Sequence, residues 1–446
     1  MRIIVAGAGE VGAYLAKMLS SENHDIVVID PDEEKLKTVS SHFDVLTVKG
    51  SSASPFILDE ADVKRADLFI GVTPTEELNI LSSVLSKNMG AKKSIARINN
   101  EEYLFPHNKD VFYKLGVDSM ISPERLAAME VICLLKQVGT TQVYDFSGGA
   151  LSLFAIKLDI HAPILNKTLI EANNFSKDFD FRAVAITRNG NTIIPKGSDV
   201  FLENDLIYVV TTRAGITNLL KFSGKKPFHV KNIMILGGSR IGIRVAKELE
   251  NHLNVKLIEI DKEKCYSLAD SLKNSLIING DGRDIDILVD EEIKEIDAFI
   301  AVTGNSETNI LSCLHAKKLG VKKTIVEIEN IDYIDLAENI GIDTVINKKF
   351  ISANQIFSFT MKSEVTSVRY LAGSGAEVLE FVVNRETPIT KSALRDLNFP
   401  KNAIVAGVVR GKSCFIAKGN SVIKANDKVV VFALPEAISD VEKLFN

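Results

Sequence analysis

The first 135 residues alternate short apolar runs with longer stretches in which apolar residues recur at helical spacing. This alternation predicts a parallel sheet with helices packed on its faces. The expected strands are residues 2–6, 25–30, 44–48, 68–72, 94–98 and 119–121. The expected helices are residues 11–19, 78–88 and 124–137. An α/β module of the doubly wound kind is therefore predicted at the start of the chain.

A different pattern follows Gly139. Residues 141–224 are rich in expected strands, and a single short helix is expected over residues 168–173. The expected strands are residues 151–158, 182–188, 192–195 and 205–211. This pattern predicts a small module of mixed strands and helix after the parallel-sheet module.

Both patterns occur twice along the chain. Residues 3–12 recur as 233–242, 66–73 as 296–303, 116–118 as 341–343, and 190–205 resemble 411–427. So many correspondences in the same order indicate a tandem duplication. We expect four modules, which are residues 1–138, 139–225, 226–362 and 363–446.

The first expected strand runs into Gly7, Gly9 and Gly12, which have the spacing of a dinucleotide-binding turn. The first glycine permits a tight turn, the second lets a pyrophosphate approach the backbone, and the third lets the next helix pack on the strand. The N-terminus of that helix offers free N–H groups to phosphates. Asp30 ends the second expected strand, 18 residues after Gly12, where a carboxylate can bind an adenosine ribose. The alternative is an ordinary glycine-rich turn, with Asp30 capping a helix.

Composition and charge add mainly exclusions. Of 446 residues, 46% are hydrophobic and 25% charged, and the net charge of −5 gives no reason to expect nucleic-acid binding. The four cysteines and seven histidines show no metal-ligand spacing, so no metal site is expected. No apolar run reaches the roughly 18 residues of a membrane span. A strand beginning almost at Met1 leaves no room for a signal peptide, and we expect a cytoplasmic protein.

With these motifs, the chain resembles the RCK domain family, also called the KTN family, along its whole length. The tandem order of its modules resembles the TrkA regulators of bacterial and archaeal Trk potassium uptake. The resemblance implies two Rossmann-like domains, each followed by a small RCK C-terminal domain. It implies binding of NAD or NADH, or of ATP, without enzymatic chemistry. It also implies a homo-oligomeric ring, built as a dimer or tetramer, that regulates a membrane potassium transporter of the TrkH or TrkG type from the cytoplasmic face.

The resemblance also assigns cofactor-binding residues in the first half. They are Gly7, Ala8, Gly9, Glu10, Val11, Gly12, Asp30, Ser51, Thr73 and Arg97. Ser51 and Thr73 each follow an expected strand, at the edge of the sheet where ligands bind in such folds. Arg97 matches a cation that approaches the phosphates in this family, and a structural ion pair is its alternative role.

The second half departs from this pattern at two positions. The residues implied there are Gly237, Ser239, Arg240, Gly242 and Asp261. Ser239 replaces the middle glycine and places a side chain where a phosphate must approach. Glu327 stands where the first half has Arg97, and its charge repels a polyphosphate, which Arg240 can offset in part. We expect a dinucleotide site in the first half and a weaker or altered site in the second.

Three further residue sets leave alternatives open. Glu77 and Asn79 recur in the second half, and a ligand contact, a helix cap and a subunit contact explain them equally well. The helix expected after Pro123 is a packing element and a candidate for dimerisation. An NAD-dependent dehydrogenase is the competing function, but it needs an acid or base near the nicotinamide, and neither half repeats such a residue.

Overall fold

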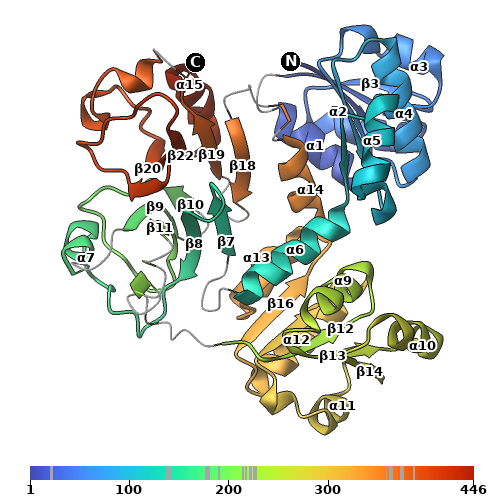
Figure 1. The fold of residues 1–446 in the computed structure, drawn as a ribbon, viewed down its shortest axis with the longest axis vertical. Coiled ribbons are helices and arrows are strands. Elements are labelled where there is room, and N and C mark those ends of the chain that lie inside the picture. The colour runs from blue at the N-terminus through green and yellow to red at the C-terminus, as the bar shows by residue number, and fades with distance from the viewer. Residues whose placement is uncertain are drawn as a thin grey trace. The chain divides into compact units, whose positions relative to one another are not determined.

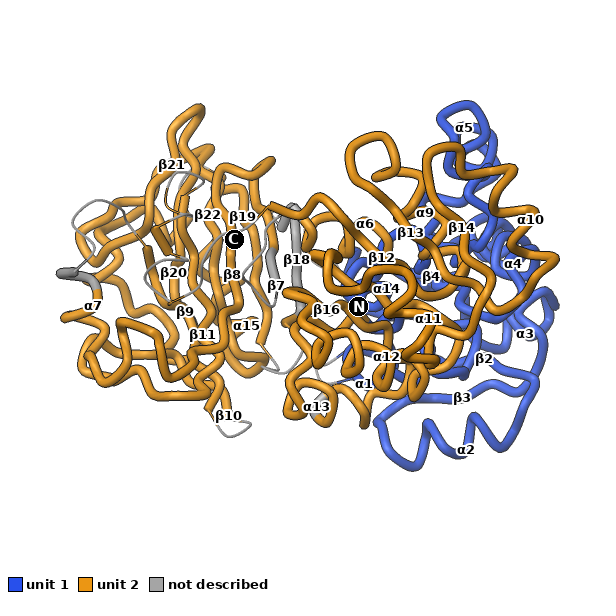
Figure 2. The backbone as a smooth tube through the Cα atoms, turned by 90° about the horizontal axis from the view of Figure 1, so that it is seen from below, with its two compact units in different colours: residues 1–127, 347–361 blue, residues 128–346, 362–446 orange. Residues whose placement is uncertain are grey.

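The computed structural model describes the chain except for residues 21–23, 137–141, 176–180, 189–190, 213–214, 216–217, 220–223, 225–228, 358, 361–364, 372–375, 385–386 and 446. The described residues form two compact units. Unit 1 consists of residues 1–127 and 347–361, and unit 2 of residues 128–346 and 362–446 (Figure 2). Residues 347–361, which come from the second half of the duplication, therefore belong to the same unit as residues 1–127.

Unit 1 contains a six-stranded parallel sheet with helices on its faces (Figure 1). Its strands are β1 (Arg2–Ala6), β2 (Asp25–Asp30), β3 (Leu46–Lys49), β4 (Leu68–Gly71), β5 (Lys93–Arg97) and β6 (Ser119–Ile121). They lie in the order β3-β2-β1-β4-β5-β6. The order reverses beside β1, which is the switch point at which ligands bind in doubly wound sheets.

The helices of unit 1 include one from late in the chain. They are α1 (Glu10–Ser20), α2 (Glu33–His42), α3 (Pro55–Glu60), α4 (Glu76–Met89), α5 (Pro106–Leu115), the start of α6 (Pro123–Lys136), and α14 (Lys348–Phe357). Helix α14 packs on α1, and the ring centroids of Tyr14 and Phe350 lie 4.8 Å apart. The N-terminal turn of α1 is thus bordered by a helix from the second half.

Unit 2 repeats the parallel sheet. Its strands are β12 (Asn232–Leu236), β13 (Asn254–Glu259), β14 (Ser275–Asn279), β15 (Ala298–Ala301), β16 (Lys323–Glu327) and β17 (Thr344–Ile346). Its helices are α9 (Arg240–Leu249), α10 (Lys262–Ser271), α11 (Ile285–Asp290), α12 (Ser306–Lys318) and α13 (Asp332–Asn339). The strand order β14-β13-β12-β15-β16-β17 is that of the first sheet, which confirms the predicted duplication.

Unit 2 also contains two five-stranded antiparallel sheets. The first sheet has the order β10-β9-β11-β8-β7, and the second has the order β18-β19-β22-β20-β21. The first is built from β7 (Gln142–Phe146), β8 (Leu151–Lys157), β9 (Phe181–Arg188), β10 (Asn191–Ile193) and β11 (Leu206–Thr212), with α7 (Leu169–Phe175). The second is built from β18 (Val365–Leu371), β19 (Ala376–Val382), β20 (Ala403–Arg410), β21 (Ser413–Ile416) and β22 (Lys428–Ala433), with α15 (Pro435–Phe445).

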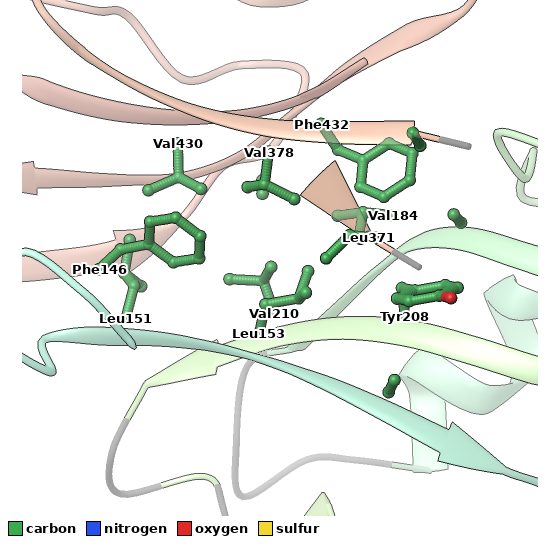
Figure 3. Close-up of a cluster of buried hydrophobic side chains, with 14 of the residues drawn as sticks. Phe146, Leu151, Leu153, Val184, Tyr208, Val210, Leu371, Val378, Val430 and Phe432 are labelled. Atoms are coloured by element: carbon green, nitrogen blue, oxygen red, sulfur yellow. The ribbon is translucent and has the colours of Figure 1, made fainter. Parts of the chain in front are cut away.

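The two antiparallel sheets share one hydrophobic core (Figure 3). Phe146, Leu153 and Tyr208 come from the first sheet and meet Val378 and Phe432 of the second. The Tyr208 and Phe432 rings lie 6.2 Å apart between centroids. Since this apolar surface is buried only when the sheets pack together, the two small domains stabilise each other.

The fold class predicted from the sequence is confirmed, with two Rossmann-like parallel sheets and two small α+β domains. The predicted limits of the four modules stay a prediction, because the compact units follow different boundaries. No helix in the described part of the chain is both long and apolar enough to cross a membrane.

Candidate nucleotide-binding site

The glycine-rich turn of unit 1 joins β1 to α1. Gly7 has a φ of 113°, which favours glycine, and its N–H donates to the Ile29 carbonyl over 2.8 Å. A Cβ on Gly12 would lie 1.7 Å from the Gly7 carbonyl oxygen, so the helix could not pack here with any larger residue. At Gly9, by contrast, no atom lies within 4 Å of the Cβ position. Gly7 and Gly12 serve packing, whereas Gly9 faces open space.

Asp30 ties the end of β2 to this turn. Its carboxylate is buried, with 7% of the residue exposed. Oδ2 accepts the Ala8 N–H over 2.7 Å and Oδ1 accepts the Asp32 N–H over 2.9 Å. Because each carboxylate oxygen has two acceptor sites, Asp30 keeps the capacity to accept ribose hydroxyls. The expected ribose acid therefore lies directly beside the expected phosphate turn.

Asn79 joins the ends of β4 and β5 and is almost fully buried, with 1% of the residue exposed. Its Oδ1 accepts the N–H and the hydroxyl of Thr73 over 2.8 and 2.7 Å. Its Nδ2 donates to the carbonyls of Thr73 and Arg97 over 3.0 and 2.9 Å. These four bonds use the whole capacity of the amide. Asn79 thus links the ends of two strands by side-chain hydrogen bonds, a role that the sequence had not indicated.

Arg97 is the last residue of β5 and is half-buried. Its Nε is buried and has no hydrogen-bond partner among the described residues. A buried N–H group is costly unless an acceptor bonds it, and an anion is a favourable acceptor for the N–H of a permanent cation. A phosphate would meet this need. The alternative role of Arg97 in a structural ion pair finds no partner in the described part of the chain.

The remaining predicted residues of the first half lie at the same edge of the sheet. Ser51 is in the loop after β3, where its Oγ accepts the Ala53 N–H over 3.3 Å. Glu10 and Val11 form the first turn of α1, and Glu10 pairs with Lys349 of α14, with 2.5 Å between Oε2 and Nζ. The fold thus brings the predicted first-half residues to the carboxyl edge of one sheet, while their contact with a ligand stays a prediction.

The turn of the second parallel sheet keeps the packing glycines. Gly237 has a φ of 104°, and a Cβ on Gly242 would lie 2.1 Å from the Gly237 carbonyl oxygen. Ser239 caps α9, because its Oγ accepts the Gly242 N–H over 3.3 Å. That N–H is one of the donors that a phosphate would otherwise use. Arg240 is exposed at the first position of α9.

Asp261, which the sequence predicts as the ribose acid of the second half, does not occupy the position that Asp30 has in the first half. Asp261 caps α10, since its Oδ1 accepts the Lys264 N–H over 3.1 Å. Glu259 occupies the position of Asp30, because it accepts the Gly238 N–H over 2.9 Å and the Asp261 N–H over 3.1 Å. The reason is that the second half has one residue fewer between the turn and this strand, so that Glu259 falls at the strand end. Asp261 corresponds to Asp32.

Glu259 differs from Asp30 in having a cationic partner. The Lys264 Nζ lies 2.9 Å from its Oε2. Burial opposes ionisation of Glu259, but hydrogen bonds from the Asp261 N–H, the Lys264 ammonium and the Gly238 N–H together hold its pKa below the usual range. Lys264 therefore already occupies part of the acceptor capacity of the Glu259 carboxylate that ribose hydroxyls would otherwise use.

A cavity of about 340 Å³ adjoins the turn of the second sheet. Its lining includes Ser239, Glu259, Lys264, Asp281 and Arg283. The Arg283 Nη2 lies 2.6 Å from the Asp281 Oδ2, so that these charges neutralise each other. The predicted Glu327 is buried at the end of β16, at the position of Arg97. The cavity beside the second parallel sheet is thus less favourable to phosphates than the turn of the first sheet.

A second cavity, of about 880 Å³, lies between the two small domains. Its lining includes Arg182, Lys196, Arg395, Lys401 and Lys418 and no acidic residue. The Arg182 Nη1 donates to the Ala417 carbonyl over 2.5 Å, which joins the two domains. This lining suits an anion.

Potential metal and redox groups are sparse. No cluster of three or more His, Cys, Asp or Glu residues suited to a metal ion occurs among the described residues. None of the four cysteines, all of which are described, forms a disulfide; Cys265 and Cys313 are buried, and Cys133 and Cys414 are half-buried. Burial raises the pKa of the Cys313 thiol.

Comparison with known proteins supports the duplication, because two family models each match the chain twice. The model of the TrkA-N domain matches residues 3–123 and 233–348, and that of the TrkA-C domain matches residues 153–224 and 378–446. The chain belongs to the TrkA family. The matches cover both parallel sheets and most of both antiparallel sheets, so the family resemblance seen in the sequence is confirmed.

Relatives match over the full length. The Trk system potassium uptake protein TrkA of Vibrio alginolyticus is 32% identical, over 100% of this chain and 98% of the relative. A TrkA homolog of Archaeoglobus fulgidus is 34% identical, over 100% of both chains. Among solved structures, the GsuK channel has a TM-score of 0.62 at 17% identity and covers 99% of this chain and 78% of its own. The likeness to GsuK shows a shared RCK fold.

Proposed function

We propose that this TrkA family member is a regulatory subunit of a potassium-uptake system that binds NAD or NADH at the first parallel sheet. Its relatives are named as Trk system potassium uptake proteins, and one structurally similar chain is a GsuK channel bound to NAD. The observation that carries the proposal is the buried, unpartnered Nε of Arg97 at the same sheet edge as Gly9 and Asp30. Together these groups offer a cation, an open turn and a ribose acceptor.

The arrangement favours NAD or NADH over NADP. The 2′-phosphate of NADP would lie against the Asp30 carboxylate, which would repel it. ATP shares the adenosine and phosphate groups that the turn would bind, so ATP is a competing ligand. Asp30 contacts only the ribose, and therefore it does not discriminate between NADH and ATP.

In this proposal the ligand acts by changing a conformational equilibrium. A nucleotide can favour one state of the protein only by binding that state more tightly than the other. The favoured state would then act by contact on a membrane potassium transporter of the TrkH or TrkG type, from the cytoplasmic side. A homo-oligomeric ring would present several such lobes to one transporter.

The test is a titration of the pure protein with NADH, followed by cofactor fluorescence. Asp30→Ala and Arg97→Ala each remove a charge-assisted contact and should weaken binding by about 10-fold or more. Asp261→Ala should leave the affinity unchanged, because Asp261 caps a helix. If Asp261→Ala weakens NADH binding more than Asp30→Ala and Arg97→Ala do, the NADH site has been assigned to the wrong half of the chain.

The same sample separates the regulator from the NAD-dependent dehydrogenase that is the alternative function. Steady oxidation of NADH in the presence of small oxidised metabolites would favour the dehydrogenase. Stoichiometric binding without turnover, together with a nucleotide-dependent change in transport by the membrane partner, would support the regulator.

A further inference from the structure

We propose that Lys349 is a positioning residue for the first phosphate turn, where it neutralises Glu10 before a dinucleotide binds. This inference rests on the proposed function of the first parallel sheet. Lys349 lies on α14, which follows the second parallel sheet in sequence but packs within unit 1. The second half of the chain would thereby contribute a charge to the site of the first half.

The geometry fixes Lys349 beside the turn. Its Nζ lies 2.5 Å from the Glu10 Oε2, and its side chain is only 11% exposed, whereas that of Glu10 is 72% exposed. The Asn347 Oδ1 accepts the N–H groups of Lys349 and Phe350 over 2.9 and 3.0 Å and so fixes the start of α14. The contact of Phe350 with Tyr14 holds the same turn of α14 against α1.

The negative charge of Glu10 would disfavour a phosphate at the turn unless a cation such as Lys349 neutralised it. Glu10 follows Gly9 directly, at the N-terminus of α1, which is the place where the helix dipole attracts an anion. A pyrophosphate bound at the turn would therefore lie close to a carboxylate and be repelled by it. The Lys349 ammonium cancels that charge without occupying the open space beside Gly9.

The second half of the chain supports a functional link between the positions of Glu10 and Lys349. Ile121 and Ile346 pair with Arg97 and Glu327 in their respective sheets, so they are equivalent. Three residues beyond each isoleucine stand Glu124 and Lys349. The position of Glu10 is taken by Arg240 in the second half, so the duplication has inverted the charge at both positions. Positions that change sign together are expected for groups that balance each other.

The experiment compares NADH with adenosine, which lacks phosphates, in the full-length protein. Lys349→Met should weaken NADH binding roughly 5-fold, as expected for one unbalanced charge about 8 Å from a phosphate at an effective dielectric constant of about 40. The affinity for adenosine should not change. Lys349→Arg keeps the charge and should retain wild-type affinity. Lys17→Met, on the exposed side of α1, is the matched control and should have no effect.

The double variant decides the mechanism. A protein that combines Lys349→Met with Glu10→Gln should bind NADH about 5-fold more tightly than Lys349→Met alone, because the carboxylate that Lys349→Met leaves unbalanced is then absent. Equal losses for NADH and adenosine would show that Lys349 merely docks α14 and would overturn the inference. Wild-type binding with no change in Lys349→Met would refute the inference alone. Failure of the wild type to bind NADH or ATP would refute the proposed function and this inference together.

Discussion

The two parallel sheets share their packing residues and differ where a ligand would bind. Both turns have a glycine with positive φ, at Gly7 and Gly237, and a third glycine that lies against the first. The hydrogen-bonded link formed by Asn79 recurs at Asn309, whose Oδ1 accepts the Thr303 N–H over 3.0 Å. Residues required for folding have therefore been kept in both copies.

The differences lie at the carboxyl edge. The open Gly9 becomes the helix cap Ser239, and Arg97 becomes the buried Glu327. Each change makes the second edge less favourable to phosphates. A duplicated domain can lose a ligand and keep its structure, because the glycines for packing and the glycine for ligand access are different residues.

The largest expected effect concerns the third glycine of each turn. Gly12→Ala and Gly242→Ala should each reduce the free energy of unfolding by about 3 kcal/mol or more, because the new methyl group meets a backbone carbonyl that cannot move aside. Denaturant unfolding followed by circular dichroism measures this. Gly9→Ala is the control, since its Cβ meets open space. Equal stability of the Gly9 and Gly12 variants would contradict the division between packing and access.

A second contrast involves the lysine that begins an equivalent strand in each sheet. Lys93 is exposed at the start of β5, whereas Lys323 at the start of β16 is only 2% exposed. Burial lowers the pKa of Lys323 to about 8, although Asp343 and Cys133 act in the opposite direction. Cys133 lies on the part of α6 that belongs to unit 2, and the buried lysine marks that packing.

Lys323→Met should therefore stabilise the protein at pH 7. The pKa of Lys323 is about 8 in the folded protein and 10.5 for an unperturbed lysine, so between these values the unfolded chain binds more protons. Wild-type stability should thus rise with pH through this window, by up to about 3 kcal/mol from this group. Below pH 8 the lysine is charged in both states and its burial costs most.

The measurement is the difference in unfolding free energy between wild type and variant at pH 7 and pH 10.5. The advantage of Lys323→Met should be largest at pH 7 and disappear near pH 10.5, while Lys93→Met should behave as wild type at both. A destabilised Lys323→Met at pH 7 would show that the partners of the ammonium outweigh its burial.

Periodicity was sufficient for much of the fold. The strands of the first sheet were predicted to within about two residues at each end, because buried parallel strands are continuous apolar runs. Helix α2 was missed because only Leu36 and Val39 are buried along it. Strand β7 was missed as well, because what stabilises it is its pairing with β8, which a pattern within its own five residues does not indicate.

The geometry of the candidate site was predictable where residue type determined it, as for Gly7, Gly12 and Asp30. It was not predictable where geometry depended on a loop length. Because the second half has one residue fewer before β13, Glu259 and not Asp261 takes the position of Asp30. Both are acids near the end of an apolar strand, so the sequence alone does not distinguish them. The contribution of Lys349 could not be foreseen either, because no local pattern indicates that α14 packs on α1.

The smallest expected effect tests ligand access at the middle glycine. Gly9→Ser should copy the arrangement at Ser239, where the hydroxyl accepts a helix N–H over 3.3 Å. The new cap should stabilise the protein by a few tenths of a kcal/mol relative to glycine, and Ser239→Gly should cost a similar amount. Gly9 lacks a positive φ, so serine fits without backbone strain.

NADH binding should respond in the opposite sense to stability. Because the serine side chain occupies both the open space and one N–H donor, Gly9→Ser should weaken NADH binding by about 5-fold, the equivalent of one lost hydrogen bond. Ser239→Gly should leave the NADH affinity of the first site unchanged, which makes it the matched control. A Gly9→Ser protein that binds NADH as tightly as the wild type would mean that the phosphates do not approach the turn at Gly9. In that case the weaker binding predicted for the second half would have to come from Glu327 and Glu259 alone.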